Sequence, residues 1–183
     1  MNDLVQTLLS IKNPRNNFIE RPELIQGYTE DEIKQIEQKY NIPIHGQFKE
    51  LLMTMGKCSG GLLFSSNMYI YNNIHINHYL DEYLRKEMQN NIDYQDFIKN
   101  TGNINLSDKQ FLVFAGINEN IIRYFMLVAD KNDIVYEWDT NEDTVREFGT
   151  LFDFLKYYRQ ITTSKITGKH NNDFKELTTG RLL

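Results

Sequence analysis

With 183 residues, of which 40% are hydrophobic and 13% aromatic, the chain can bury one sizeable core, so we exclude a disordered protein and predict one compact domain. The net charge of -5, from 25 acidic and 20 basic residues, argues against a nucleic acid as the partner and favours a basic protein. A single cysteine excludes an internal disulfide framework, and no apolar run reaches membrane-spanning length, so we expect a cytoplasmic protein without membrane contact.

Two helices are predicted in the first 41 residues. Apolar residues at helical spacing between positions 4 and 11 indicate a short amphipathic helix that ends before Pro14. A loop follows. Thr29, with Glu32 three positions later, then has the form of a capping box, which predicts a second helix that continues to about Asn41. The charged residues of this second helix are expected to form a solvated face.

A third helix is predicted after the turn at Pro43. Apolar residues recur at i, i+3, i+4 and i+7, which indicates a helix that begins at Gln47 or Phe48. The apolar stripe of this helix consists of Phe48, Leu51, Leu52 and Met55. Gly56 is expected to stop the helix in the left-handed conformation that glycine tolerates.

The glycine pair at positions 60–61 is expected to reverse the chain into a short strand at residues 62–64. The alternating segment 68–72 predicts a second strand that pairs with the first. The apolar period then changes. It indicates a helix over residues 80–88 and a shorter one that begins near Asp93.

From residue 111 the sequence predicts mainly β structure. Apolar and β-branched segments at residues 111–115, 121–128 and 134–138 are separated by turn-rich sequences and indicate an antiparallel meander. Thr150 with Asp153 predicts the start of a last helix with an apolar stripe of its own.

These elements predict one α+β domain over residues 1–183. Its core is expected at about residues 27–160, with a polar, loosely held C-terminal tail at residues 161–183. The sheet is expected to be mixed but largely antiparallel, with five or so strands and with helices packed against it.

Several segments in this order resemble the SUKH superfamily: GYTEDEIKQIEQKY, FKELLMTMGKCSGGLLF, FLVFAGINENIIRYFMLV, IVYEWD and FGTLFDFLKYY. The resemblance extends from about Gly27 to Tyr158 and is densest around Gly56 and the 60–61 glycine pair. One departure is visible, because His45 stands where members usually have a proline.

The superfamily gathers bacterial immunity proteins and a fungal regulator of cell-wall synthesis. The resemblance therefore implies a SUKH-like fold and a non-enzymatic protein that neutralises a cognate toxin by direct contact. It also implies the kind of partner, a basic nuclease-type effector of a bacterial polymorphic or contact-dependent toxin system. We expect no cofactor and a monomer or weak homodimer. The alternative is a regulatory scaffold like the fungal relative, which predicts several partners and added disordered arms.

An enzyme would need a convergent polar site, which the sequence does not display. GKCSGG lacks the first glycine and the Ser or Thr of a phosphate-binding loop, and it follows a helix instead of a strand. Cys58 is a candidate nucleophile, with His45, His75 and His78 as candidate bases. No local signature pairs them, and a small, buried or half-buried side chain is the favoured interpretation of a lone cysteine.

The segment that contains His75 and His78 also has the residue types of metal ligands, because Asp81 and Glu82 follow closely. A His-x-x-His pair without cysteines or a second ligand cluster is unspecific. A polar helix N-terminus that faces water is the favoured interpretation, and we predict no metal site.

Acidic residues concentrate between positions 130 and 147, where only Lys131 and Arg146 carry the opposite charge. In the structural interpretation these carboxylates cap turns and discourage edge pairing. In the functional interpretation they form an acidic docking face, which would meet the basic cleft of a nuclease toxin through long-range steering and charge-assisted hydrogen bonds. The candidate partner-binding residues are Asp130, Asp133, Glu137, Asp139, Glu142 and Asp143, with Tyr69 and Tyr71 as an aromatic alternative.

Overall fold

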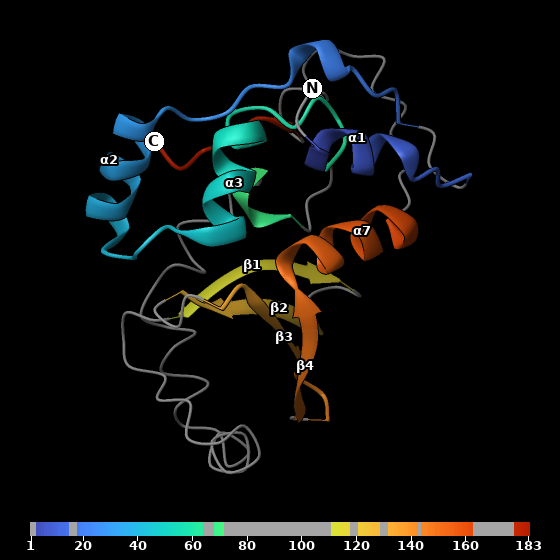
Figure 1. The fold of residues 1–183 in the computed structure, drawn as a ribbon. Coiled ribbons are helices and arrows are strands. Elements are labelled where there is room, and N and C mark those ends of the chain that lie inside the picture. The colour runs from blue at the N-terminus through green and yellow to red at the C-terminus, as the bar shows by residue number, and fades with distance from the viewer. Residues whose placement is uncertain are drawn as a thin grey trace.

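The structure, a computed structural model, describes residues 3–14, 18–63, 68–71, 111–117, 121–128, 132–142, 144–162 and 178–183. In these ranges α-helices gather on one side of a four-stranded sheet (Figure 1). The helices are α1 (Asp3–Ser10), α2 (Glu30–Tyr40), α3 (Gly46–Met55) and α7 (Leu151–Ile161), with the short 3-10 helices η1 (Pro22–Leu24) and η2 (Tyr69–Tyr71). The strands are β1 (Phe111–Ile117), β2 (Ile122–Leu127), β3 (Ile134–Asp139) and β4 (Thr144–Thr150). This arrangement confirms the predicted α+β class.

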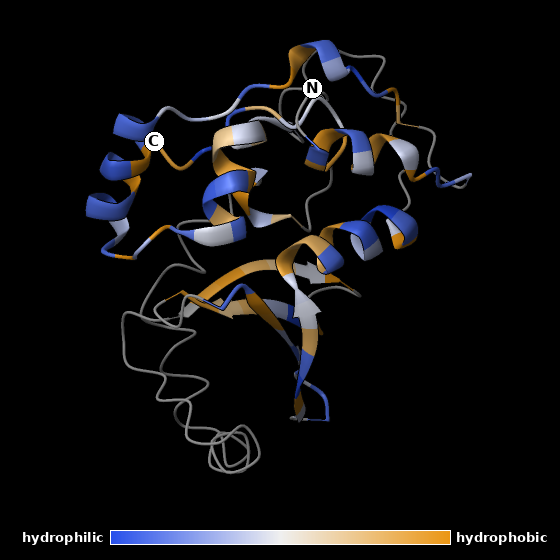
Figure 2. Ribbon diagram, viewed as in Figure 1, coloured by the Kyte–Doolittle hydropathy of each residue, from blue (hydrophilic) through white to orange (hydrophobic). Residues whose placement is uncertain are grey.

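Helix α2 is confirmed together with its capping box. The Thr29 hydroxyl accepts a hydrogen bond from the Glu32 backbone N–H at 3.3 Å, and the Glu32 carboxylate accepts one from the Thr29 N–H at 2.8 Å. Two N–H groups at the start of the helix are thereby paired. Ile33 and Ile36 are buried, whereas the outer face of α2 is hydrophilic (Figure 2).

Helix α3 begins at Gly46, whose φ of 53° lies in the region that favours glycine. The prediction that Gly56 adopts the left-handed conformation is wrong, because its φ of -62° lies in the right-handed helical region. Glycine is needed there for close packing instead. A Cβ at Gly56 would lie 2.5 Å from the Leu52 carbonyl oxygen and 2.6 Å from the Tyr28 ring.

The chain reversal at residues 60–61 is confirmed, since both glycines have positive φ. The predicted strand is wrong where it is described, because Leu62 and Leu63 form a turn and bury their side chains from it. The predicted strand that follows is also wrong, since Met68 makes only an isolated bridge to Ala115 and η2 comes next. An apolar run this short predicts that its side chains are buried, but it does not distinguish a strand from a turn. The predicted helices at residues 80–88 and near Asp93 lie outside the described residues.

The sheet has the order β1-β2-β3-β4, and each neighbouring pair is antiparallel. The predicted meander is confirmed in β1 to β3. The described sheet is smaller than the five or so strands expected and contains no parallel pair. Strand β4 was not predicted, because a bulge places Glu147 opposite Tyr136 and Gly149 opposite Val135. The bulge breaks the alternation by which a strand is recognised.

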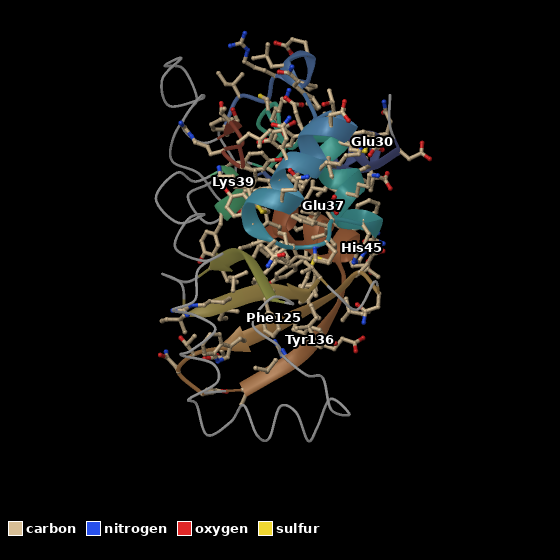
Figure 3. All side chains as sticks on the ribbon, turned by 90° about the vertical axis from the view of Figure 1, so that its left-hand side faces the viewer. Glu30, Glu37, Lys39, His45, Phe125 and Tyr136 are labelled. Carbon is tan, nitrogen blue, oxygen red and sulfur yellow. The ribbon has the colours of Figure 1, made fainter. Side chains whose placement is uncertain are left out.

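The two faces of the sheet bury different clusters. The face toward the helices contributes Phe114 and Tyr124 to the main core, where Phe154 of α7 contacts both rings. On the opposite face Phe125 stacks on Tyr136, with ring centroids 5.4 Å apart, within a second buried cluster. Figure 3 shows this pair away from α2 and α3.

Helix α7 follows β4 directly and is held to the N-terminal segment by a buried arginine. Its first turn has the predicted capping box, in which Thr150 and Asp153 each accept from the other's backbone N–H. Arg159, near its end, donates to the carbonyls of Leu8, Ile11 and Leu62. A fourth hydrogen bond, at 2.6 Å, joins Arg159 to the Glu20 carboxylate. Segments that are distant in the sequence therefore meet at one side chain.

The expectation of a loosely held tail is wrong for residues 178–182. The Thr178 carbonyl accepts from the Ser59 N–H at 3.0 Å, and the Gly180 N–H donates to the Lys57 carbonyl at 2.9 Å. Leu182 is buried in the main core. The segment lies beside α2, where the C-terminus is marked in Figure 1. The polar composition of the tail predicted loose attachment, whereas backbone hydrogen bonds and the buried Leu182 side chain hold this segment in place.

Candidate partner-binding surface

The predicted acidic docking residues lie in several different environments. Asp130 and Asp143 are outside the described residues. Asp133 has a structural role, because its carboxylate accepts from the Gln47 N–H at 2.8 Å and caps the start of α3. Its carbonyl accepts from the Leu151 N–H at 2.9 Å, where α7 begins. Asp133 thus joins the starts of two helices and is not a freely projecting charge.

Asp139 and Glu142 lie in the turn between β3 and β4. The Asp139 carboxylate accepts from the backbone N–H groups of Asn141 and Glu142 at 2.9 and 3.1 Å. This is the turn-capping role that the structural interpretation predicted. Glu142 itself is exposed, as is Glu147 on β4. These two carboxylates are therefore accessible to a partner.

Glu137 occupies the middle of a row of side chains across three strands. The antiparallel register places it opposite Tyr124 of β2 and opposite Arg146 of β4. The Tyr124 hydroxyl donates to Glu137 Oε2 at 2.9 Å. Arg146 donates to the other oxygen, Oε1, from Nε at 2.8 Å, and its Nη2 forms an ion pair with the same oxygen at 2.5 Å. Both oxygens of this carboxylate are therefore held in place.

Burial differs sharply along this row. The Glu137 side chain is 9% exposed, whereas that of Arg146 is 77% exposed. Tyr124 is fully buried, and burial, together with its hydrogen bond to Glu137, raises the pKa of its hydroxyl well above the usual range. The tyrosine consequently remains a hydrogen-bond donor at physiological pH. The row leads from a buried phenol, through a buried carboxylate, to a cation at the surface.

Half-buried aromatic side chains border the row. The Tyr124 and Phe148 rings meet edge to face, with centroids 5.6 Å apart, and Phe148 contacts Tyr157 of α7 at 5.1 Å. Phe148 and Tyr157 are both partly buried. We define the hairpin surface as Glu137, Arg146, Phe148 and Tyr157 together with two exposed carboxylates, Glu142 in the adjoining turn and Glu147 on the other face of strand β4. It combines residue types common at protein interfaces with a local excess of negative charge.

The charged face of α2 differs from the hairpin surface. Glu30 pairs with Lys49 at 2.8 Å, and Glu32 pairs with Lys57 at 2.7 Å. Further along, the Glu37 carboxylate accepts from the Ile44 N–H at 2.7 Å. Glu30 and Glu37 are labelled in Figure 3. Lysines from α3 and the loop after it thus balance the acidic start of α2.

The two tyrosines of the aromatic alternative are buried. Tyr71 is fully buried and donates its hydroxyl to the Met55 carbonyl at 2.9 Å. Tyr69 is 1% exposed and belongs to the cluster on the far face of the sheet. Neither side chain is at the surface of this structure, so we place the candidate surface on the hairpin.

Within the described residues, the candidate nucleophile Cys58 is not brought together with the candidate base His45. His45 precedes α3 and contacts the Val128 carbonyl, at the junction of α3 and the sheet (Figure 3). Cys58 follows α3, is half-buried, and lies between Gln26 and Thr179 in two isolated β-bridges. The intervening helix of ten residues is about 15 Å long.

Within the described part of the chain, no group of three or more His, Cys, Asp or Glu residues is placed to hold a metal ion. His75, His78, Asp81 and Glu82 lie outside it. None of the helices in the described ranges has the length and apolar character needed to cross a bilayer.

A cavity of about 300 Å³ lies beside Arg159, lined also by Phe18 and Asn13. Its buried polar groups already have partners. Arg159 is bonded to Glu20 and three carbonyls, and the Asn13 amide donates to the carbonyls of Gln160 and Thr162. We interpret the cavity as a space beside a structural ion pair.

The sequence indicates Glu137 as a candidate but does not indicate the residues that hold it. Tyr124 lies in an apolar strand and was not distinguished from core residues. Arg146 stood out only as an isolated cation. The signal that identifies both is the strand register, because a hairpin that pairs Asp139 with Thr144 necessarily places Glu137 near Arg146.

Comparison with protein families gave one match. The model of the SMI1 / KNR4 family (SUKH-1) matches residues 27–157. A search of the curated proteins and a search of the solved structures found no match. The matched range contains α2, α3, the whole described sheet and most of α7, and it therefore includes the hairpin surface.

Proposed function

Because the chain belongs to the SMI1/KNR4 family (SUKH-1), we propose that it is an immunity protein that neutralises a cognate toxin by binding it directly. Family membership supports an immunity or regulatory role in general. The single observation that carries the proposal is the match over residues 27–157, which covers most of the chain. The proposed site of action is the cytoplasm of the cell that makes the toxin, and the protein acts there as a monomer or weak homodimer without enzymatic activity.

The charge of the hairpin surface supports a basic partner. Across the described residues 134–150, four carboxylates accompany one cation, Arg146. A nuclease toxin binds a polyanion and therefore carries a basic cleft. An acidic inhibitor meets such a cleft with faster association, because long-range attraction steers the two proteins together. We propose the hairpin surface as the docking site, with Glu142 and Glu147 as its steering charges.

A protection assay tests the proposed function. Cells that express the toxin encoded beside this gene should survive only when the chain is co-expressed, and the purified pair should co-elute. Absence of both protection and complex would contradict immunity. If the chain instead captures several proteins and none of them is a toxin, the regulatory alternative replaces it.

A charge-reversal pair tests the docking site. Glu142→Lys with Glu147→Lys should slow association with the toxin about tenfold at low salt, because the local field changes sign. Glu23→Lys with Asp31→Lys is the matched control, since both side chains are exposed (65% and 85%) and the net charge changes equally. Equal slowing in both variants would remove the docking site from the hairpin and leave only a net-charge effect.

A further inference from the structure

We propose that Glu137 is a binding site for an arginine side chain of the partner, which takes the place that Arg146 occupies in the free protein. This inference rests on the proposed function and names the chemical group that the surface recognises. The partner is a basic protein that presents an arginine to the hairpin surface, and Arg146 is an internal occupant that leaves when this arginine enters.

The geometry of the site is already that of a guanidinium receptor. Arg146 donates from Nε to Oε1 of Glu137 at 2.8 Å, and its Nη2 lies 2.5 Å from the same oxygen in an ion pair. The other oxygen accepts from the Tyr124 hydroxyl at 2.9 Å, which fixes the orientation of the carboxylate. A planar guanidinium can present two N–H groups to one acceptor, whereas the ammonium of lysine is a point charge. The site therefore favours arginine over lysine.

The distribution of burial makes the exchange feasible. Arg146 is 77% exposed, so its guanidinium is already hydrated and loses little on returning to water. The released side chain is hydrated on the exposed strand β4, and no buried group has to follow it. Glu137 is only 9% exposed and cannot turn out to solvent with it. A departing Arg146 would thus leave a buried carboxylate in need of a new cation.

A partner protein can exclude water from the ion pair with Glu137, which the exposed Arg146 does not do. When a second protein covers the hairpin surface, the new ion pair is removed from water on both sides, and its hydrogen bonds strengthen. The exposed carboxylates Glu142 and Glu147 attract a cation to this place and repel an anion. The partly buried rings of Phe148 and Tyr157 offer apolar surface for the aliphatic part of an arginine.

Chemical rescue tests the site without the toxin. Arg146→Ala removes the internal occupant, and methylguanidinium serves as the probe. At about 20 mM it should raise the melting temperature of Arg146→Ala relative to the same concentration of sodium chloride, by mass action on the folded state. Wild type should show no such rise, because its site is occupied.

Two control variants define the result. Arg146→Ala combined with Glu137→Gln should lose the rescue, since the anionic acceptor is gone. Arg21→Ala should also show none, because the Arg21–Glu23 pair is exposed on both sides, at 42% and 65%. An equal shift in all variants, or no shift in Arg146→Ala, would overturn the proposal.

Binding to the cognate toxin tests the exchange itself. Arg146→Ala should bind at least as tightly as wild type, because the occupant that must leave is absent. Glu137→Gln should bind about tenfold more weakly while it retains the circular dichroism spectrum of wild type. Weaker binding by Arg146→Ala would show that Arg146 itself contacts the toxin and would overturn the exchange. If no toxin is bound by wild type, the proposed function fails, and the rescue experiment still decides whether Glu137 accepts a guanidinium.

Discussion

The molecule contains two arginine–carboxylate pairs with opposite burial. In the pair between Arg159 and Glu20 the arginine side chain is 4% exposed and the carboxylate 21%. In the pair between Arg146 and Glu137 the arginine is 77% exposed and the carboxylate 9%. The two pairs therefore differ in which side chain can leave. Arg159 is buried and must stay, whereas Arg146 is exposed and can move into water.

Arg159 illustrates the fixed case. Besides Glu20 it satisfies three carbonyl oxygens, which come from α1, from the segment after α1 and from the turn at Leu62. A buried carbonyl without a donor is costly, so no competing arrangement releases this arginine. When Arg146 departs, the Glu137 carboxylate loses its cation but keeps the hydrogen bond from Tyr124 and can accept another cation.

The largest effect is expected from Arg159→Met. The substitution retains apolar volume but removes the donor of Glu20 and of the Ile11 and Leu62 carbonyls, whereas the Leu8 carbonyl still accepts from the Ile11 N–H. It should lower the free energy of unfolding by about 3 to 5 kcal/mol. Denaturant titration measures this loss. Arg146→Met is the matched control. A loss below about 1 kcal/mol for Arg159→Met would mean that both arginines are peripheral, and the contrast between the pairs would disappear.

A smaller effect is expected from Tyr124→Phe. The substitution retains the ring but removes the hydroxyl that donates to Glu137 at 2.9 Å, which should cost about 1 to 2 kcal/mol. Tyr40→Phe serves as the control, since it removes the hydroxyl of a partly buried tyrosine on α2. A neutral Tyr124→Phe would show that the hydroxyl does not hold the carboxylate.

The same variant tests the raised pKa of Tyr124. Burial and the hydrogen bond to Glu137 favour the neutral phenol in the folded state, so the folded protein retains this proton more tightly than the unfolded chain. The stabilisation is complete below about pH 10, the usual pKa of tyrosine, and is lost as the pH rises above it. In denaturant titrations at alkaline pH, the free energy of unfolding of wild type should therefore no longer exceed that of Tyr124→Phe. An advantage that is constant to pH 11 would contradict the assignment.

Arg146→Ala should have a minor effect on stability, about 1 kcal/mol, because the guanidinium is largely hydrated and the buried Glu137 carboxylate keeps its hydrogen bond from Tyr124. Thermal and denaturant unfolding both measure it. A loss of 3 kcal/mol or more would show that Arg146 is as firmly bound as Arg159, and the exchange at Glu137 would then be too costly.

The smallest effect is the response of each pair to salt. At 1 M sodium chloride the Debye length falls to about 3 Å, so the difference between wild type and Arg146→Ala should shrink by a few tenths of a kcal/mol. The difference for Arg159→Met should remain the same, since that guanidinium is buried. Equal salt responses would indicate that exposure does not distinguish the two pairs.

Local signals were sufficient to predict some elements. Thr29 with Glu32, and Thr150 with Asp153, encode helix starts within four residues, and both capping boxes form. The meander of β1 to β3 was also predictable from composition and turn residues. Gly56 was misjudged because its role depends on Tyr28, which lies far away in the sequence. Tertiary contacts of that kind cannot be predicted from neighbouring residues.

The candidate surface shows the same division. The excess of acidic residues was visible, whereas their separate roles depend on tertiary structure. Glu137 is buried because β2 and β4 flank it. Asp133 accepts a hydrogen bond at the start of α3. Tyr71 donates to the Met55 carbonyl in the core. The bulge in β4 concealed the strand on which Arg146 lies.

The docked segment at residues 178–182 has a consequence for how the protein is made. The hydrogen bond from the Leu182 N–H to the Tyr28 hydroxyl spans 154 positions, and the contact between Cys58 and Thr178 spans 120. During synthesis, the contacts of Tyr28 and Cys58 with this segment therefore cannot form until more than a hundred further residues have emerged. Contacts of such long sequence separation slow folding. The nascent protein exposes apolar surface around Tyr28 until then, and this period is when we expect it to depend on chaperones.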